Sequence, residues 1–336
     1  MNSLDALLKR AGVTDAQAAK IRQFFAQSSG FTGIAHVDIE PTLRQSVNFS
    51  DGPAETEDRE GQRDEPTDIT GAEPTLGRYI DLGLLGSGGM GEVRRVLDPD
   101  LKRRLAMKIV HPRILTIDAA LGRFIDEAQI VAQLQHPNII PVHEIGRLED
   151  GRLYFTMKEV QGRPLSEIIL DVHNASTDLA WQSTTDGWTF RRLIDVLVQV
   201  CAATSFAHSK GVVHRDLKPE NILVGKFDEV LVVDWGIAKV ISDLREVAAE
   251  RAVPVQTFRS TADMTRMGEV AGTPAYMAPE QASGQTDKVG TATDVYTLGA
   301  ILYEILSGLP PYHGYSASLV LEYVKERPPS SLRLLS

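Results

Sequence analysis

The sequence is poor in cysteine, since its 336 residues include only Cys201. No disulfide can therefore form within the chain, and a lone thiol fits a reducing compartment. Cys201 lies in a helical pattern of apolar residues, which indicates a core side chain rather than a reactive thiol. The eight histidines show no pair at helical metal-ligand spacing and no companion cysteines, so a structural zinc site is not expected.

Long apolar runs and basic patches are also missing. Ionisable residues such as Asp195 and Asp234 interrupt the longest apolar segments, so none reaches the roughly 18 residues of a membrane span. The N-terminus has acids on both sides of a short apolar segment, unlike a secretory signal. We therefore expect a cytoplasmic protein. A net charge of −10 argues against a nucleic-acid partner, while 43% hydrophobic content allows a large core.

Composition divides the chain into three parts. Residues 1–28 carry a helical apolar period and predict a short helical segment. Residues 29–75 include a stretch rich in proline, glycine and acids, and predict a disordered acidic linker. Residues 76–336 predict a folded domain of class α+β.

This domain is expected to have two lobes joined by a hinge. Alternating segments around residues 78–85, 92–97, 104–110, 142–147 and 152–157 predict five strands, and a helix runs through Phe124 to Leu134. They make an N-lobe over 76–157, followed by a hinge over 158–163. The C-lobe, 164–336, is expected to hold helices at 165–171, 190–210 and 292–308, with an inserted loop at 172–189 and a less regular tail.

The stretch GSGGMG supplies Gly86, Gly88 and Gly91. A dinucleotide site would need a helix after the last glycine and an acid about 20 residues on, and neither is found. Val93 continues a strand instead, so the glycines lie at a hairpin tip where backbone can close over phosphates. Taken alone, the motif also fits a mobile glycine turn.

Two charged residues fit this phosphate site. Lys108 lies on the third strand, 17 residues after Gly91, where its ammonium could hold phosphate oxygens. Glu127 lies on the inner face of the following helix, and a buried carboxylate needs a cation. A solvated lysine and a surface glutamate are the alternatives.

The stretch HRDLKPEN, residues 214–221, carries the densest polar chemistry. Asp216 can accept the proton of a hydroxyl nucleophile, and Lys218 can neutralise a transferring phosphoryl group. Asn221 and the later Asp234 offer the oxygen ligands that a hard cation prefers. A capped turn explains neither Lys218 nor the pairing with Asp234.

From residue 78 onward the chain resembles the eukaryotic-like Ser/Thr protein kinases of bacteria. GSGGMGEV, LAMK, Glu127, HRDLKPEN, DWG, GTPAYMAPE and TDVYTLGAILYEILSG follow one another in that family's order. The resemblance implies a bilobal kinase fold and transfer of the ATP γ-phosphoryl group to Ser/Thr hydroxyls of protein substrates. It also implies Mg²⁺, with Mn²⁺ as an alternative, and autophosphorylation of the activation loop.

The resemblance assigns roles to individual residues. Asp216 would be the base, assisted by Lys218, with Lys108 paired to Glu127 and Thr273 marking Ser/Thr specificity. Asp294 would anchor the catalytic-loop backbone, and Arg215 would pair with a phosphate on the activation loop. The ATP site would comprise Leu85, Gly86, Gly88, Gly91, Val93, Ala106, Lys108, Met157, Lys158, Val160 and Leu223, the metal ligands Asn221 and Asp234, and the loop phosphosites Thr265, Thr261 and Ser260.

Three features depart from the family pattern. Trp235 replaces the phenylalanine after the metal-binding aspartate, and we expect it to pack against Val131, Val142 and His214. The segment from Asp234 to Glu280 spans 47 residues, which predicts an insertion at 241–262. The sequence stops at PPSSLRLLS, so we expect a C-lobe without its last helices.

Such a C-lobe has predicted consequences. Glu280 would lack its arginine, and the helix at 292–308 would be partly uncovered, which favours self-association. The second hypothesis is accordingly a pseudokinase or truncated nucleotide-binding interaction module with little phosphotransfer.

Overall fold

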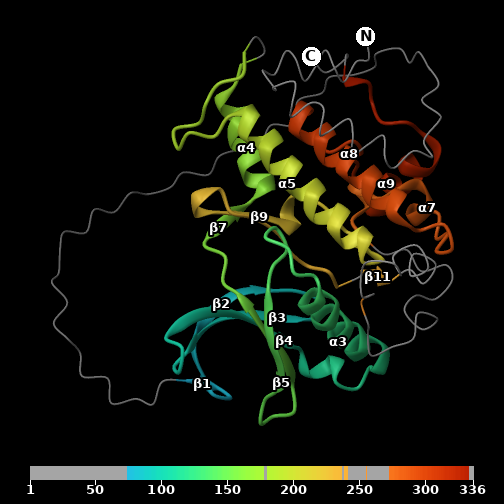
Figure 1. Ribbon diagram of the computed structural model, residues 1–336. Helices are drawn as coiled ribbons and strands as arrows, with labels where there is room; N and C mark the ends of the chain where they lie inside the picture. The colour runs from blue at the N-terminus through green and yellow to red at the C-terminus, as the bar shows by residue number, and fades with distance from the viewer. Residues whose placement is uncertain (1–73, 178–179, 237, 241–254, 256–271, 333–336) are drawn as a thin grey trace.

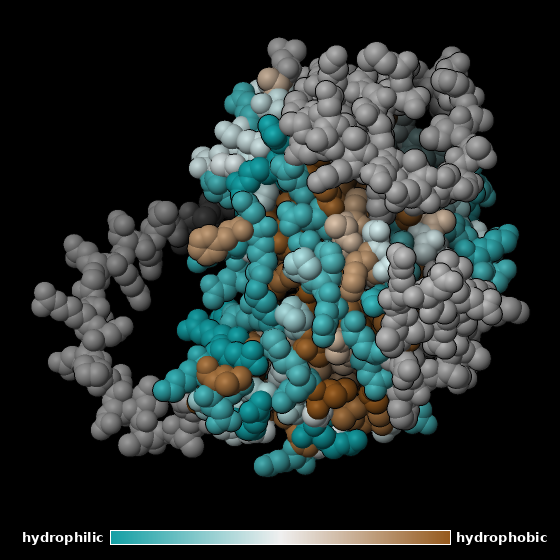
Figure 2. Space-filling model, viewed as in Figure 1, coloured by the Kyte–Doolittle hydropathy of each residue, from teal (hydrophilic) through white to brown (hydrophobic). Residues whose placement is uncertain are grey.

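A computed structural model describes residues 74–177, 180–236, 238–240, 255 and 272–332. It has two parts, a β-sheet with one helix at the bottom of Figure 1 and a mainly helical part above it. This arrangement confirms the predicted α+β, bilobal class. The surface on the side shown in Figure 2 is mostly hydrophilic, with hydrophobic side chains visible near one end of α3 (Asp118–Gln133).

The N-lobe is built on a six-stranded antiparallel sheet with the order β1-β2-β3-β4-β6-β5. Its sixth strand, the short β1, adds one to the five that were predicted. The bounds are β1 Thr75–Leu76, β2 Tyr79–Ser87, β3 Gly91–Asp98, β4 Arg103–Val110, β5 Val142–Arg147 and β6 Leu153–Lys158, with the 3-10 turn η1 (Pro112–Ile114) before α3.

Alternation along β4 gives the sheet two different faces. Leu105, Met107 and Ile109 are buried on the outer face, in a cluster with Tyr79 and Tyr154. Val110 lies on the inner face, in the cluster that contains residues of α3. Because side chains alternate along a strand, Ala106 and Lys108 also belong to this inner face, toward the C-lobe.

The C-lobe has a large apolar core. Helix α5 (Phe190–Ser209) runs through it and contacts α8 (Thr291–Ser307). Cys201 on α5 is buried, and burial raises the pKa of its thiol to about 12, which confirms the predicted core role. The remaining elements are β7 Gly162–Pro164, α4 Leu165–Ala175, β8 Val212–Val213, η2 Pro219–Asn221, β9 Ile222–Gly225, η3 Lys226–Asp228, β10 Val230–Val232, β11 Lys239–Val240, η5 Pro274–Tyr276, α7 Pro279–Ala282 and α9 Ala317–Glu326.

Two predicted irregular segments are partly helical. Helix α4 continues to Ala175, past the expected end at 171, because Val172 extends its apolar face into the core. The tail, predicted to be irregular, forms α9, whose first turn is capped by the Ser316 hydroxyl. Val320 and Val324 of α9 are buried in a cluster with Met277 and Tyr312. The two valines are four positions apart, a spacing that places both on one helix face.

Two observations bear on the predicted weakness around Glu280, whose lack of an arginine partner stays a prediction. This carboxylate is only half-buried and accepts a hydrogen bond from the Thr293 hydroxyl at 2.7 Å. The apolar residues of α8 are covered, since Leu298, Ile301 and Ile305 are all fully buried. The α8 face therefore gives no argument for self-association.

Several predictions fall outside the described residues: the helical segment 1–28, nearly all of the linker 29–75, all of the insertion 241–262 except residue 255, and the phosphosites Ser260, Thr261 and Thr265. Among the helices that the structure does describe, none combines the length and the apolar character needed to cross a bilayer.

Candidate active site

The glycine hairpin between β2 and β3 forms one wall of the site. Its tip is closed by a hydrogen bond from the Gly88 amide to the Gly91 carbonyl, at 2.8 Å. A Cβ at Gly91 would lie 2.1 Å from the Ile109 carbonyl oxygen, so only glycine fits there. A Cβ at Gly86 or Gly88 would meet no atom within 4 Å, which leaves open space beside the tip.

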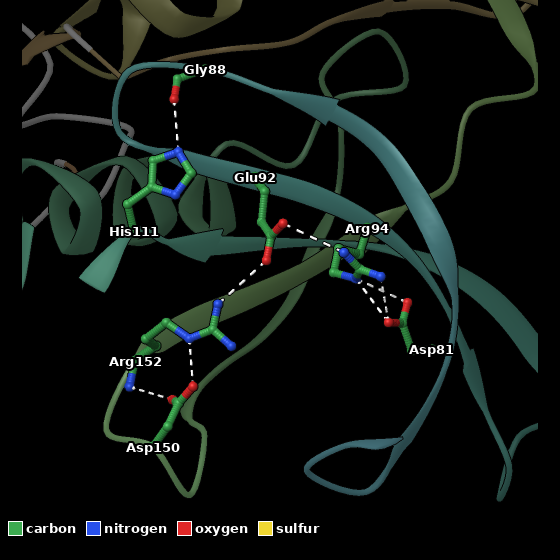
Figure 3. Close-up of polar contacts among 7 residues, drawn as sticks. All are labelled: Asp81, Gly88, Glu92, Arg94, His111, Asp150 and Arg152. Carbon is green, nitrogen blue, oxygen red and sulfur yellow. Dashed lines mark hydrogen bonds and ion pairs between the residues drawn. The ribbon is translucent and has the colours of Figure 1, made fainter. Parts of the chain in front are cut away.

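The hairpin tip is tied to the residues that follow β4. A ring nitrogen of His111 lies 3.0 Å from the Gly88 carbonyl oxygen, as Figure 3 shows. The Arg113 guanidinium donates to the Gly89 carbonyl oxygen at 3.0 Å. These contacts hold the tip to the strand that carries Lys108.

Lys108 and Glu127 form a buried ion pair across the sheet and α3. The ammonium lies 2.6 and 2.8 Å from the two carboxylate oxygens and 3.7 Å from Asp234 Oδ1. Burial lowers the pKa of Lys108, but the carboxylates of Glu127 and Asp234 more than offset this, so the net pKa is raised. The lysine therefore stays charged.

Asp216, Lys218 and Thr273 converge on the C-lobe side of the site. Thr273 donates its amide and its hydroxyl to Asp216 Oδ1, at 2.8 and 2.9 Å. Lys218 Nζ donates to the Thr273 hydroxyl oxygen at 2.8 Å and lies 3.5 Å from Asp216 Oδ2. The structure thus brings together three predicted residues that are up to 57 positions apart.

Asp294 of α8 fixes the backbone that presents Asp216. Its two carboxylate oxygens accept hydrogen bonds from the backbone amides of His214 and Arg215, both at 2.9 Å. His208 Nε2 lies 2.8 Å from one of the same oxygens. Arg215 adopts a left-handed φ of 74°, a conformation unfavourable to L residues. Buried hydrogen bonds from a fixed helix hold this strained turn.

Asn221 and Asp234 suit a hard cation. The Asn221 amide nitrogen donates to the Asp216 carbonyl oxygen at 2.9 Å, which leaves the amide oxygen for a ligand. The Asp234 side chain is 51% exposed, and its backbone has a left-handed φ of 60°. A Cβ atom at Gly236 would lie only 3.2 Å from Asp234 Oδ1 and from Glu127 Oε2, so a side chain there would crowd both carboxylates. The donor set of one carboxylate and one amide oxygen fits Mg²⁺.

Trp235 is accommodated in the core. Its indole is buried, and its ring centroid lies 4.4 Å from that of His214. It belongs to the cluster that contains Val131 and against which Val142 packs, as the sequence predicts. Burial lowers the pKa of His214, which favours the neutral ring that this packing needs.

The other residues predicted for the ATP site come from β2, from the interior strands β3, β4 and β6, from the hinge and from β9. Ala106 pairs in register with Met157, at the start of the hinge. The Lys158 amide already donates to the Pro141 carbonyl oxygen at 3.1 Å, and its side chain pairs with Glu229. Val93, Val160 and Leu223 are half-buried, whereas Leu85 is 43% exposed at the rim.

Sequence reasoning missed several supporting contacts. Gln281 donates its side-chain amide to the Arg215 carbonyl oxygen at 2.8 Å, and Arg95 pairs with Glu159 of the hinge. No spacing signal marks them, because each pair joins residues far apart in the chain.

Comparison with known proteins agrees with this geometry. Residues 79–327 match the family model described as protein kinase domain. The chain is 41% identical over 238 residues to serine/threonine-protein kinase PknD of Protochlamydia amoebophila. It is 37% identical over 238 residues to PknD of Chlamydia felis, and 35% identical over 261 residues to pkn3 of Myxococcus xanthus.

These alignments cover 70%, 70% and 76% of this chain but only 23%, 24% and 42% of the three relatives. The chain therefore spans about a quarter of the length of the two PknD proteins. The family match covers more than half of the chain and includes the glycine hairpin, the Lys108–Glu127 pair and the Asp216 loop. On this evidence, the chain belongs to the protein kinase domain family.

Proposed function

We propose that this chain transfers the γ-phosphoryl group of ATP to Ser/Thr hydroxyls of proteins. The observation that carries the proposal is the convergence of Lys218 and Thr273 on Asp216. An aspartate held beside a lysine can receive a hydroxyl proton while the lysine neutralises the charge that develops on the phosphoryl group.

Asp216 is arranged to use one particular oxygen. Its Oδ1 is occupied by the amide and the hydroxyl of Thr273. Its Oδ2 faces Lys218 at 3.5 Å and is the oxygen left to accept the proton of an incoming hydroxyl. Binding of the substrate hydroxyl beside Oδ2 would place the nucleophile next to the neutralising ammonium.

Other residues hold the nucleotide and its metal. Lys108, kept charged by Glu127, is placed to bind phosphate oxygens, and the amides of the glycine hairpin can cover them. Asn221 and Asp234 would hold Mg²⁺, which supplies charge neutralisation between the phosphates when bound. Divalent metal and ATP use follow from the family, while the choice of Mg²⁺ rests on the oxygen donor set.

We also propose autophosphorylation of the activation loop, with Thr265 as the first candidate and Thr261 and Ser260 next. Its support is the position of Arg215, a cation directly before the catalytic aspartate. Mass spectrometry after incubation with ATP and Mg²⁺ tests this. We expect phosphate within residues 257–265, and phosphate confined to other regions would refute the assignment.

The transfer itself is tested with γ-labelled ATP and acid hydrolysis of the labelled protein. The wild-type chain should yield labelled phosphoserine or phosphothreonine. Asp216→Asn should reduce the label by about 10²- to 10⁴-fold, the usual range for loss of a general base. Label on tyrosine alone, or none from the folded wild-type chain, would reject the proposal and favour a nucleotide-binding module without transfer.

A further inference from the structure

An ion pair joins the sheet to the hinge at the edge of the proposed nucleotide site. Arg95 on β3 pairs in register with Ala106, and Val93 pairs with Lys108. Residues directly opposite in an antiparallel pair share a face, so Arg95 lies on the inner face with Val93 and Lys108. From there its Nε donates to Glu159 Oε1 at 2.5 Å.

The carboxylate of this pair is out of water. The Glu159 side chain is only 5% exposed, whereas that of Arg95 is 39% exposed. Its second oxygen, Oε2, is buried and has no hydrogen-bond partner among the residues that the structure describes. Arg95 is therefore the group that compensates the buried charge, and without it both carboxylate oxygens would be buried and unpaired.

We infer that Arg95 and Glu159 act as a clasp that positions the hinge against β3 and thereby sets the affinity for ATP. The inference rests on the proposed function, because it uses the hinge as the nucleotide-binding segment. Val160, predicted to belong to the ATP site, directly follows Glu159, and Val93 lies two residues before Arg95 on the same face. The clasp thus fixes the separation of the two walls between which the base would lie.

Loss of Arg95 has a definite mechanical consequence. An unpaired buried carboxylate can regain hydration only if its side chain turns outward, and that movement shifts the backbone on both sides of Glu159. The change acts on ground-state binding of the nucleotide and leaves the Asp216 group untouched. Binding should weaken while the maximal transfer rate persists.

The neighbouring residue provides a matched control. Arg94 pairs in register with Met107 and so lies on the outer face of the same strand. Figure 3 shows its guanidinium on Asp81, with contacts at 2.6 to 3.0 Å. Arg94→Ala therefore removes an equally close ion pair from β3 without altering the inner face.

The test compares ATP dissociation constants, KM and kcat, and thermal midpoints of the full chain. We expect Arg95→Ala to raise the dissociation constant and KM about tenfold, with kcat within about twofold, because only part of the cost of the unpaired charge is transmitted to the nucleotide site. Glu159→Gln should have a smaller effect, and the double variant Arg95→Ala/Glu159→Gln should bind ATP more tightly than Arg95→Ala alone. The charge swap Arg95→Glu/Glu159→Arg should restore most of the affinity.

The opposite results are equally clear. If Arg95→Ala lowers the thermal midpoint but leaves ATP affinity unchanged, or if Arg94→Ala weakens ATP binding to the same degree, the pair is merely structural and the inference fails. A wild-type chain that neither binds ATP nor transfers phosphate would instead reject the proposed function itself.

Discussion

At the scale of single residues, the site depends on side chains that serve more than one partner. The Thr273 hydroxyl donates to Asp216 and accepts from Lys218, so it fixes the base and the cation relative to each other. Its amide also donates to Asp216. The hydrogen bond from the backbone amide is kept in any substitution of Thr273 except by proline. The two hydrogen bonds of the hydroxyl are lost in any residue without a hydroxyl group.

Thr273→Ala should therefore lower kcat by about tenfold, because one hydrogen bond to a charged group contributes about 1.5–3 kcal/mol and the amide contact remains. Thr273→Ser keeps the hydroxyl and should retain most of the activity. Steady-state kinetics with saturating ATP measure both variants. Equal losses in the two would show that the methyl group, and not the hydroxyl bridge, matters here.

The residues of the site could be predicted because their motifs are dense and ordered. Lys108 and Glu127 pair as expected, Asp294 holds the His214 and Arg215 amides, and Trp235 packs on His214. Contacts without a motif could not be predicted. The Thr293 hydroxyl that satisfies Glu280 reflects how α7 and α8 pack, and no local pattern encodes that.

Among the secondary-structure elements, helix α8 supports the site from within the C-lobe. Asp294 in its first turn holds the Asp216 loop, and Glu304 in its last turn accepts a hydrogen bond from the Tyr276 hydroxyl at 2.7 Å. Burial raises the pKa of Glu304 to about 7, although the bond from Tyr276 opposes this, and the charge of Glu220 adds to the rise. The 3-10 turn with Tyr276 directly follows Thr273.

The raised pKa of Glu304 makes the stability of the fold depend on pH. The folded state binds this proton more tightly than the unfolded chain, so the contribution is full below about pH 4.5, the ordinary value for glutamate. It falls as the pH rises to about 7 and is then lost, a change on the order of 3 kcal/mol.

Glu304→Gln keeps an acceptor for Tyr276 and removes the titration. We expect its free energy of unfolding to exceed that of the wild type at pH 8, and its pH profile between 5 and 8 to be flatter. Denaturant titrations at each pH measure this, with Glu322→Gln, an exposed position on α9, as the control. A Glu304→Gln profile parallel to that of the wild type would contradict the assignment.

Elements with a long and regular apolar period were predictable, and short ones were not. The sheet strands and α5 agree closely with their predicted bounds. Helix α9 has ten residues, preceded by Tyr315-Ser316 and followed by Arg327-Pro328-Pro329, and only two of its side chains are buried, so its period is hardly visible in the sequence. The helix is stabilised by packing on Met277 and Tyr312. These are tertiary contacts, which the local sequence does not reveal.

In the molecule as a whole, both lobes contribute the groups that we propose for nucleotide, metal and hydroxyl. The N-lobe supplies the glycine hairpin and Lys108, and the C-lobe supplies Asp216, Asn221 and Asp234. Lys108 and Asp234 approach each other to 3.7 Å across this boundary. A ligand that binds both lobes should therefore stabilise the folded chain as a unit.

Saturating ATP with Mg²⁺ should raise the thermal midpoint, since a ligand at 100 times its dissociation constant adds about 2.7 kcal/mol. Chelation of the metal with EDTA should remove much of this increase. Asp234→Asn should respond to ATP in the same way with or without Mg²⁺, because it lacks the carboxylate ligand. An undiminished metal effect in this variant would place the cation elsewhere.

In the proposed reaction, Asp216 acts on the hydroxyl nucleophile and Lys108 on the nucleotide. Parallel measurement of ATP affinity and of the phosphotransfer rate in Asp216→Asn and Lys108→Met separates these two roles. The predicted result is near-complete loss of transfer with almost unchanged ATP affinity in Asp216→Asn, and loss of both in Lys108→Met. Equal loss of nucleotide affinity in the two variants would contradict the account.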